Sequence, residues 1–136
     1  MKFSILITSY NKGQYIEECI KSCLRQTHKN FEIILCDNYS TDNSNQIFDK
    51  YKKDIKLVRK KRISSYPPVN QIDLIKEAYS IIEGEIICLL DADDYFLSNK
   101  LEIIENEFFK KKSLEAIFDL PLIKKLDFIN KMELKN

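Results

Sequence analysis

An unbroken apolar run at residues 86–90 ends directly in a cluster of acids, Asp91, Asp93 and Asp94. The run shows no polar alternation, which predicts a strand that is buried on both faces of a sheet. Carboxylates at the end of such a strand repel one another and lose solvation, and a bound divalent cation offsets that cost. Ligands bind at the carboxyl ends of strands in open α/β sheets. The pattern therefore predicts a Mg²⁺ or Mn²⁺ site that holds a phosphate-bearing ligand.

Composition narrows the class of protein. The chain has 136 residues, of which 44% are hydrophobic and 32% charged, and these values are typical of one globular domain. Its 22 basic and 21 acidic residues nearly balance, which argues against nucleic acid as the main partner. No segment has the pattern of a membrane span or of a signal peptide, so we expect a cytoplasmic location. Four cysteines and one histidine, His28, lack the spacing of a zinc site, and a structural disulfide is not expected either.

The order of apolar and polar segments predicts an α/β fold. Strands are predicted at residues 3–8, 31–36, 55–58 and 86–90, and helices at residues 15–25, from the turn at 37–43 to about 51, at 69–82 and at 98–111. Alternating strands and helices indicate a mostly parallel sheet with helices on both faces. Glycine occurs only at Gly13 and Gly84. The glycine-rich dinucleotide and Walker phosphate loops are therefore excluded, and a bound nucleotide must be held in another way.

Two predicted helices have a definite inward face. In the first helix, apolar residues fall at the i, i+3, i+4, i+7, i+8 spacing. They are Ile16, Cys19, Ile20, Cys23 and Leu24. The inward residues predicted for the third helix are Ile72, Ile75, Ala78, Tyr79 and Ile82. We expect Gly84 to end that helix and Ser98 to cap the next one.

The regular pattern ends near residue 112. We expect residues 1–112 to form the α/β domain and residues 113–136 to form an irregular or helical tail. In that tail, Leu122, Ile123, Leu126 and Ile129 have the spacing of one amphipathic helix. The lysines at 110–112 together with the apolar tail are compatible with peripheral contact at the inner face of a membrane. A solvated helix end is the simpler interpretation of the same residues.

Three polar loops follow three of the predicted strands, and a parallel sheet would bring them together. Tyr10 in the first loop can stack on a base or pack against the protein. Asp37 and Asn38 in the second loop can accept hydrogen bonds from a base N–H or a ribose hydroxyl, whereas Asp42 is expected to cap a helix. The acids at 91–94 can hold a metal that bridges a diphosphate. Together the loops predict a nucleoside-diphosphate site.

In these segments the chain resembles the family 2 glycosyltransferases, which have the fold type called GT-A. The resembling segments are residues 5–11, Gln26-Thr27 ahead of residues 31–34, residues 37–42 and residues 84–94. The resemblance implies that residues 1–112 form a nucleotide-sugar-binding domain. It also implies a role for six residues. Thr8 and Tyr10 would line the base pocket, Asp37 and Asn38 would face the base and ribose, Asp91 would lie near the ribose and metal, and Asp93 would bind the metal directly.

The resemblance further implies a transferase. A sugar would pass from a nucleotide-diphosphate sugar, with UDP favoured, to a glycan or lipid-linked acceptor in glycan or cell-surface polysaccharide synthesis. Mn²⁺ or Mg²⁺ would stabilise the leaving diphosphate.

Two departures from the family pattern leave alternatives open. The family often has a second acid at the position of Asn38. Its members are also longer than this chain, and their catalytic base lies in the second half, so Glu102, Glu105 and Glu107 are not assigned that role. A homo-oligomer or a second chain could complete the site. The other interpretations are a nucleotide-sugar-binding protein or remnant without turnover, and a nucleotidyltransferase, which would usually have a glycine-rich basic loop.

Overall fold

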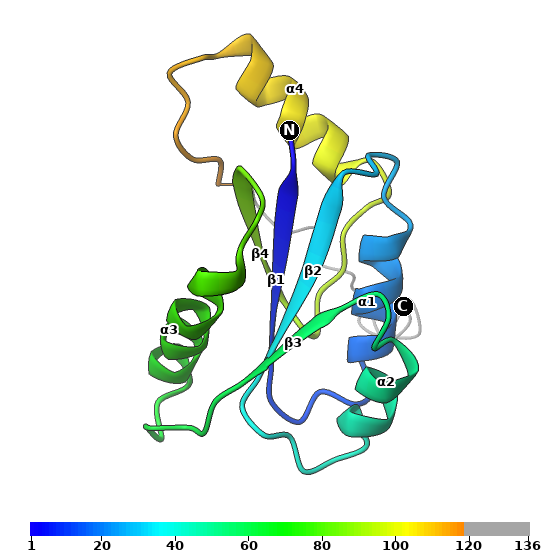
Figure 1. Cartoon of the computed structure of the whole chain (residues 1–136), viewed down its shortest axis with the longest axis vertical. Helices are drawn as coiled ribbons and strands as arrows, with labels where there is room; N and C mark the ends of the chain where they lie inside the picture. The colour runs from blue at the N-terminus through cyan, green and yellow to red at the C-terminus, as the bar shows by residue number, and fades with distance from the viewer. Residues whose placement is uncertain (119–136) are drawn as a thin grey trace, which may run out of the picture.

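The fold is a parallel four-stranded sheet with helices on both faces, as the sequence predicts (Figure 1). The computed structural model describes residues 1–118. The strands are β1 (Phe3–Ser9), β2 (Phe31–Asp37), β3 (Lys56–Arg59) and β4 (Ile86–Asp91), in the spatial order β3-β2-β1-β4. The helices are α1 (Ile16–Leu24), α2 (Ser44–Lys50), α3 (Pro67–Ala78) with the short 3-10 helix η1 (Tyr79–Ile81), and α4 (Lys100–Lys110).

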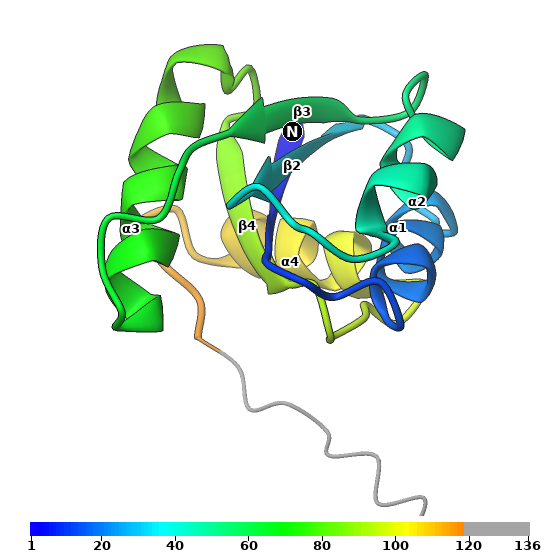
Figure 2. The same ribbon diagram turned by 90° about the horizontal axis from the view of Figure 1, so that it is seen from below.

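Alternate residues of the central strand β1 enter two separate cores. Ile5 and Ile7 pack in the larger core with apolar residues of α1, α2 and α4. Leu6 points the other way and packs with Leu74 and Ala78 of α3. This arrangement follows from the period of two along a strand, and the view along the sheet in Figure 2 shows α3 on one side and α1 and α2 on the other.

Helix α1 has the inward face that its sequence predicts. Ile16, Cys19, Ile20 and Cys23 are all buried in the larger core, and Leu24 packs against it. All four cysteines are buried and none forms a disulfide, so each thiol acts as a small apolar group. No helix within residues 1–118 has the length and apolar character that crossing a bilayer requires.

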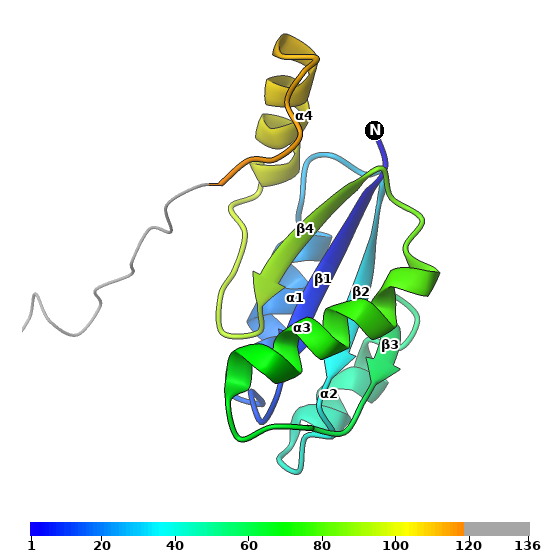
Figure 3. The same ribbon diagram turned by 90° about the vertical axis from the view of Figure 1, so that its left-hand side faces the viewer.

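Strand β4 corrects one expectation. Cys88 and Leu90 are buried, but Ile87 is 43% exposed and Leu89 is 60% exposed, so the prediction of burial on both faces is wrong. The reason is topological: β4 is an edge strand of the described sheet, as Figure 3 shows, and α3 packs mainly over β1, β2 and β3.

Helix α3 differs from its predicted face because a polar residue lies on the buried side. Its buried residues are Asn70, Leu74 and Ala78, whereas Ile72 and Tyr79 are 54% and 71% exposed. The buried amide of Asn70 is hydrogen-bonded to the preceding loop: Oδ1 accepts from Ile63 N at 2.9 Å, and Nδ2 donates to Ser64 O at 2.8 Å. Predicted inward residues Ile75 and Ile82 are partly buried against the smaller core.

Gly84 and Ser98 also have roles other than those predicted. Gly84 follows η1 but does not have a positive φ, so it does not end the helix with a left-handed backbone conformation. A Cβ there would lie 2.4 Å from Ser4 N, and this close approach to β1 is what requires glycine. The residue that precedes α4 is Asn99, with no side-chain cap, and Ser98 instead accepts a hydrogen bond from Thr27 N at its carbonyl, 2.8 Å away.

The predicted tail is only partly within the described structure. Residues 113–118 form no helix or strand. The apolar residues on which the predicted extra helix depends, at positions 122, 123, 126 and 129, lie outside the described residues.

Candidate functional site

Strand register brings the three polar loops to one edge of the sheet. Thr8 is paired with Asp91 across β1 and β4, and Ser9 is paired with Asp37 across β1 and β2. Figure 2 shows the sheet from the side on which the carboxyl ends of the strands lie. A hollow of about 370 Å³ lies there between the strand ends and α3. Polar and aromatic residues that line it include Thr8, Tyr10, Lys12, Asn38, Arg62, Gln71, Asp91 and Asp93.

Asp91 is held in place by two neighbours. Thr8 Oγ1 donates to Asp91 Oδ1 at 2.9 Å, and Gln71 Nε2 of α3 donates to the same oxygen at 2.5 Å. Gln71 Nε2 also lies 2.9 Å from Thr8 Oγ1. Residues of β1 and α3 thus fix one oxygen of Asp91 and orient its carboxylate at the wall of the hollow.

Asp93 is paired with a lysine of the first loop. Lys12 Nζ lies 2.5 Å from Asp93 Oδ2, and the two side chains are 37% and 42% exposed. This charged hydrogen bond lowers the pKa of Asp93 below its ordinary value and raises that of Lys12 above its ordinary value. Asp93 is therefore ionised and faces the hollow, with a positive charge of the chain itself against it.

Asp94 shows the electrostatic cost expected of an acid cluster. Burial raises its pKa above the ordinary value, and repulsion from Asp93 and Asp91 adds to the effect. Asp94 is therefore repelled by both of its acidic neighbours, as the spacing of the acids in the sequence predicts.

The second loop is a compact turn built around Asp37. Asp37 is fully buried and accepts hydrogen bonds from Ser40, from its backbone N at 3.0 Å and from its Oγ at 2.5 Å. Arg59 Nε lies 3.5 Å from the same carboxylate. In this structure Asp37 shapes the loop and does not line the hollow, so its predicted contact with a nucleotide stays a prediction.

The first and second loops are tied to each other. Asn11, with a φ of 53°, accepts a hydrogen bond from Thr41 N at 2.7 Å. Asp42 accepts from Gly13 N at 2.8 Å and from Ser44 N at 3.0 Å, so it bonds the first turn of α2, although Asn43 is the residue at the cap position. These contacts fix the backbone on both sides of Lys12.

Asn38 lines the hollow with a defined orientation of its amide. Nδ2 donates to the carbonyl oxygen of Lys60 at 3.0 Å. An amide has one donor end and one acceptor end. The donor end is engaged by the backbone, which leaves Oδ1 as the acceptor end of this lining residue.

Tyr10 lies beside the guanidinium of Arg62. Arg62 Cζ is 4.5 Å from the centroid of the Tyr10 ring, within the range of a cation–π contact. The ring is 37% exposed, so it is not a core residue. Both residues line the hollow, and an aromatic ligand that stacks on Tyr10 has to share the ring with Arg62 or displace it.

Three lining residues contact a predicted site residue through their side chains but were not themselves predicted from the sequence: Lys12, Arg62 and Gln71. Lys12 lies inside the first polar loop, and its position there is the one signal that could have indicated it. Arg62 belongs to a basic stretch at residues 59–62 that reads as a solvated surface. Gln71 lies on α3, and no local pattern relates it to Asp91, twenty residues later.

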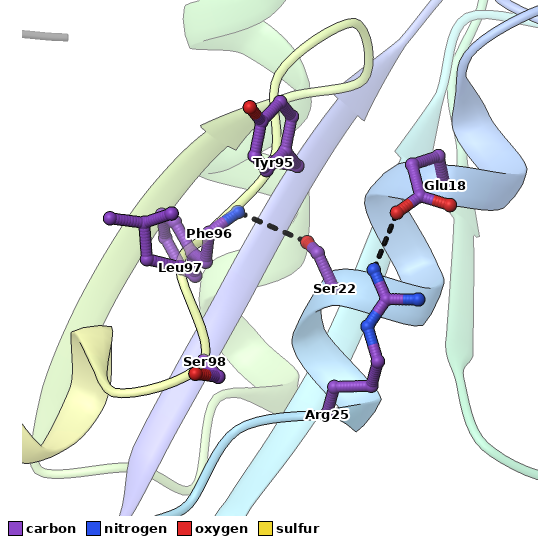
Figure 4. A pocket seen from close by; sticks show the side chains of 7 residues that line it. All are labelled: Glu18, Ser22, Arg25, Tyr95, Phe96, Leu97 and Ser98. Atoms are coloured by element: carbon purple, nitrogen blue, oxygen red, sulfur yellow. Dashed lines mark hydrogen bonds and ion pairs between the residues drawn. The ribbon is translucent and has the colours of Figure 1, made fainter. Parts of the chain in front are cut away.

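A second hollow, of about 330 Å³, lies between α1 and the loop at residues 95–98 (Figure 4). Glu18 and Arg25 form an ion pair at its rim, 2.5 Å apart, and Ser22 Oγ accepts from Phe96 N at 3.1 Å. The Ser22–Phe96 hydrogen bond connects the loop after β4 to α1. None of the six predicted site residues lines this second hollow.

The donor set at the first hollow fits a hard divalent cation held in part by its ligand. Within residues 1–118, no three acids, histidines or cysteines converge on one point as a complete metal cage. Mg²⁺ characteristically uses one or two carboxylates and takes its other ligands from phosphates and water. Lys12 bonds Asp93 through Oδ2, and Thr8 and Gln71 bond Asp91 through Oδ1. The other oxygen of each carboxylate is of the right chemistry for that arrangement.

Comparison with known proteins identifies the family. The family model described as glycosyl transferase family 2 matches residues 4–116. The chain belongs to this family. It is 34% identical over 115 residues to chondroitin synthase of Pasteurella multocida, covering 85% of this chain and 12% of that protein. It is 33% identical over 108 residues to the glycosyltransferase GlyG of Streptococcus pneumoniae, covering 79% of this chain and 35% of that protein.

Solved structures have the same architecture. TarS 1-349 of S. aureus in complex with UDP-GlcNAc superposes with a TM-score of 0.70 at 25% identity, covering 91% of this chain and 37% of that chain. The fold is thus the GT-A fold that the sequence resemblance implies. This chain spans about an eighth of the length of the P. multocida relative and about a third of the other two proteins.

Proposed function

We propose that the hollow at the strand ends is the donor site of a glycosyltransferase that takes a sugar from a UDP-sugar. The observation that carries this proposal is the convergence of an exposed ring, an amide acceptor and two carboxylates on one hollow. The TarS structure with UDP-GlcNAc supports the choice of donor class. The chondroitin synthase relative supports an acceptor in glycan or cell-surface polysaccharide synthesis.

The base preference follows from Asn38. Its Oδ1 can accept from the N3–H of uracil or the N1–H of guanine, whereas the corresponding ring nitrogens of cytosine and adenine are themselves acceptors. Two acceptors face to face leave both without a hydrogen bond, which costs about 1–3 kcal/mol at a buried position. Asn38 therefore favours UDP or GDP over CDP and ADP, and the likeness to TarS favours UDP.

A divalent cation would be held by Asp93 and by the second oxygen of Asp91, and when bound it would neutralise the charge of the leaving diphosphate. Thr8 and Gln71 orient Asp91 for this role. Tyr10 stacks on the base and Asn38 accepts from it. Together these residues bind and orient the donor and stabilise the leaving side of the reaction.

The acceptor side is not assigned to residues of this chain. The glutamates of α4 already have other partners: Glu102 accepts from Thr27, Glu105 pairs with the N-terminus and Glu107 with Lys110. None of them lines the donor hollow. We accordingly propose residues 1–112 as the donor-binding unit of the transferase.

Calorimetric titration tests the proposal. Wild-type chain would be titrated with UDP, GDP and CDP, each with and without Mn²⁺, beside Asp93→Ala and the control Glu107→Ala. The control also removes an exposed carboxylate paired with a lysine, but far from the hollow. We expect Mn²⁺-dependent UDP binding by wild type and Glu107→Ala and its loss in Asp93→Ala. Retained Mn²⁺-dependent binding in Asp93→Ala would contradict the assignment of Asp93.

A further inference from the structure

Lys12 forms an ion pair with Asp93, the carboxylate that is proposed to bind the metal. Its ammonium lies 2.5 Å from Asp93 Oδ2, at the wall of the hollow. The other carboxylate that faces the hollow, Asp91, is bonded by neutral groups of Thr8 and Gln71. A positive charge of the chain therefore stands at the acid that is proposed to bind the cation directly.

The backbone of Lys12 is fixed, whereas its side chain is not. Its carbonyl accepts hydrogen bonds from Tyr15 N and Ile16 N, both at 2.9 Å, where α1 begins. The neighbouring amides of Asn11 and Gly13 donate to Ser40 and Asp42. Beyond this anchor the ammonium is carried on a flexible four-carbon stem, is 37% exposed, and has Asp93 as its partner.

We propose that Lys12 is an exchangeable counter-ion of the donor site. In the nucleotide-free chain it neutralises Asp93 and competes with the divalent cation for that carboxylate. When cation and nucleotide bind together, the ammonium moves from Asp93 to the diphosphate, within the same hollow. This inference rests on the proposed function, because it takes the ligand to be a nucleoside diphosphate.

One consequence is that metal and nucleotide bind as a pair. Without nucleotide, the cation has to break the Lys12–Asp93 ion pair and leaves an ammonium without a partner. With nucleotide, the displaced ammonium gains a phosphate, which an ammonium binds as a point charge. Lys12 thus adds to the coupling free energy between the two ligands, and each ligand raises the affinity for the other by the same factor.

Mn²⁺ affinity in the absence of nucleotide tests whether Lys12 competes with the cation for Asp93. Free Mn²⁺ would be followed by electron paramagnetic resonance during titration of wild type, Lys12→Ala, Lys12→Arg and the control Lys110→Ala, which loses a lysine of the exposed Glu107 pair. We expect Lys12→Ala to bind Mn²⁺ roughly twofold to fivefold more tightly than wild type, the range of an exposed ion pair. Lys12→Arg and Lys110→Ala should match wild type.

UDP affinity at saturating Mn²⁺ tests whether the Lys12 ammonium binds the diphosphate. We expect Lys12→Ala to bind UDP about tenfold more weakly than wild type, because it lacks a charged hydrogen bond to phosphate. If Lys12 is only a solvated surface residue, Lys12→Ala changes neither affinity. If Lys12 only binds phosphate, Lys12→Ala leaves Mn²⁺ binding in the absence of nucleotide unchanged. The two shifts in opposite directions are the signature of exchange.

Each contrary result overturns the inference. Unchanged or weaker Mn²⁺ binding by Lys12→Ala, or no Mn²⁺ binding by any variant, removes the competition. Unchanged UDP affinity removes the transfer to diphosphate. If wild type binds Mn²⁺ but no UDP, the proposed function fails, and the transfer to diphosphate fails with it. In that case the Mn²⁺ titration still decides whether Lys12 competes for Asp93.

Discussion

Thr8 and Asp91 are 83 residues apart in the chain, yet Thr8 Oγ1 donates to Asp91 Oδ1 at 2.9 Å. The two residues are directly paired at the carboxyl ends of β1 and β4. This contact joins the first polar loop to the acid cluster.

Replacing Tyr10 by alanine should weaken UDP binding by roughly 1–3 kcal/mol, the range for a base stacked on an aromatic ring. Tyr79→Ala is the matched control, because Tyr79 is an exposed tyrosine on η1, which follows α3. Calorimetry with UDP and Mn²⁺ measures both. Equal affinity in Tyr10→Ala and wild type would mean that the ring, which already contacts Arg62, takes no part in binding.

Replacing Asn38 by alanine should reduce the preference for UDP over CDP. The amide oxygen discriminates between the N3–H of uracil and the bare N3 of cytosine, so we expect the difference in binding free energy to fall by about 1–3 kcal/mol. The measurement is the ratio of UDP and CDP dissociation constants for wild type and variant. An unchanged ratio would show that discrimination, if present, lies elsewhere.

The two glycines of the chain should respond differently to alanine. In Gly84→Ala the new Cβ would lie 2.4 Å from Ser4 N, and β1 has to shift, which we expect to cost about 1–3 kcal/mol of unfolding free energy. In Gly13→Ala the closest atom is Oδ1 of the Asn43 side chain, which can rotate away. Urea unfolding of both variants checks this order, and a larger loss for Gly13→Ala would contradict it.

Glu17 should make stability depend on pH in the acid range. Hydrogen bonds from Lys50, Lys21 and Tyr51 lower its pKa to about 2, below the ordinary value of 4.5. Because the folded-state pKa is the lower one, the contribution is present above pH 4.5 and is lost as the pH falls to about 2. Urea unfolding of Glu17→Gln and wild type should differ at pH 7, and the difference should shrink as the pH falls towards 2, where the Glu17 carboxylate takes up its proton. A constant difference would contradict this linkage.

Predictions from the sequence succeeded where a local pattern decides the outcome. The inward stripe of α1 is a matter of helical spacing, and Ile16, Cys19, Ile20 and Cys23 are buried as predicted. The parallel sheet follows from alternating elements, and the family follows from short segments around the three loops. For the site, the sequence indicated five of the residues that line the hollow, Thr8, Tyr10, Asn38, Asp91 and Asp93.

Predictions failed where a neighbour in space decides the outcome. The apolar composition of β4 indicates burial but not which face, and its place at the sheet edge exposes Ile87 and Leu89. On α3, the buried face includes Asn70, a polar residue that an apolar pattern does not predict to be buried. Its burial depends on hydrogen bonds to the loop at 63–66, which only the tertiary structure shows.

The sequence by itself determined the fold class, the three polar loops and the acids at the end of β4, because these depend on spacing along the chain. Tertiary structure alone decided which partners those residues have. Sheet register put Thr8 against Asp91, the packing of α3 brought Gln71 to the same carboxylate, and the bend of the first loop set Lys12 on Asp93. The physical reason is that a hydrogen bond or ion pair needs atoms within about 3 Å, a condition that separation along the chain does not specify.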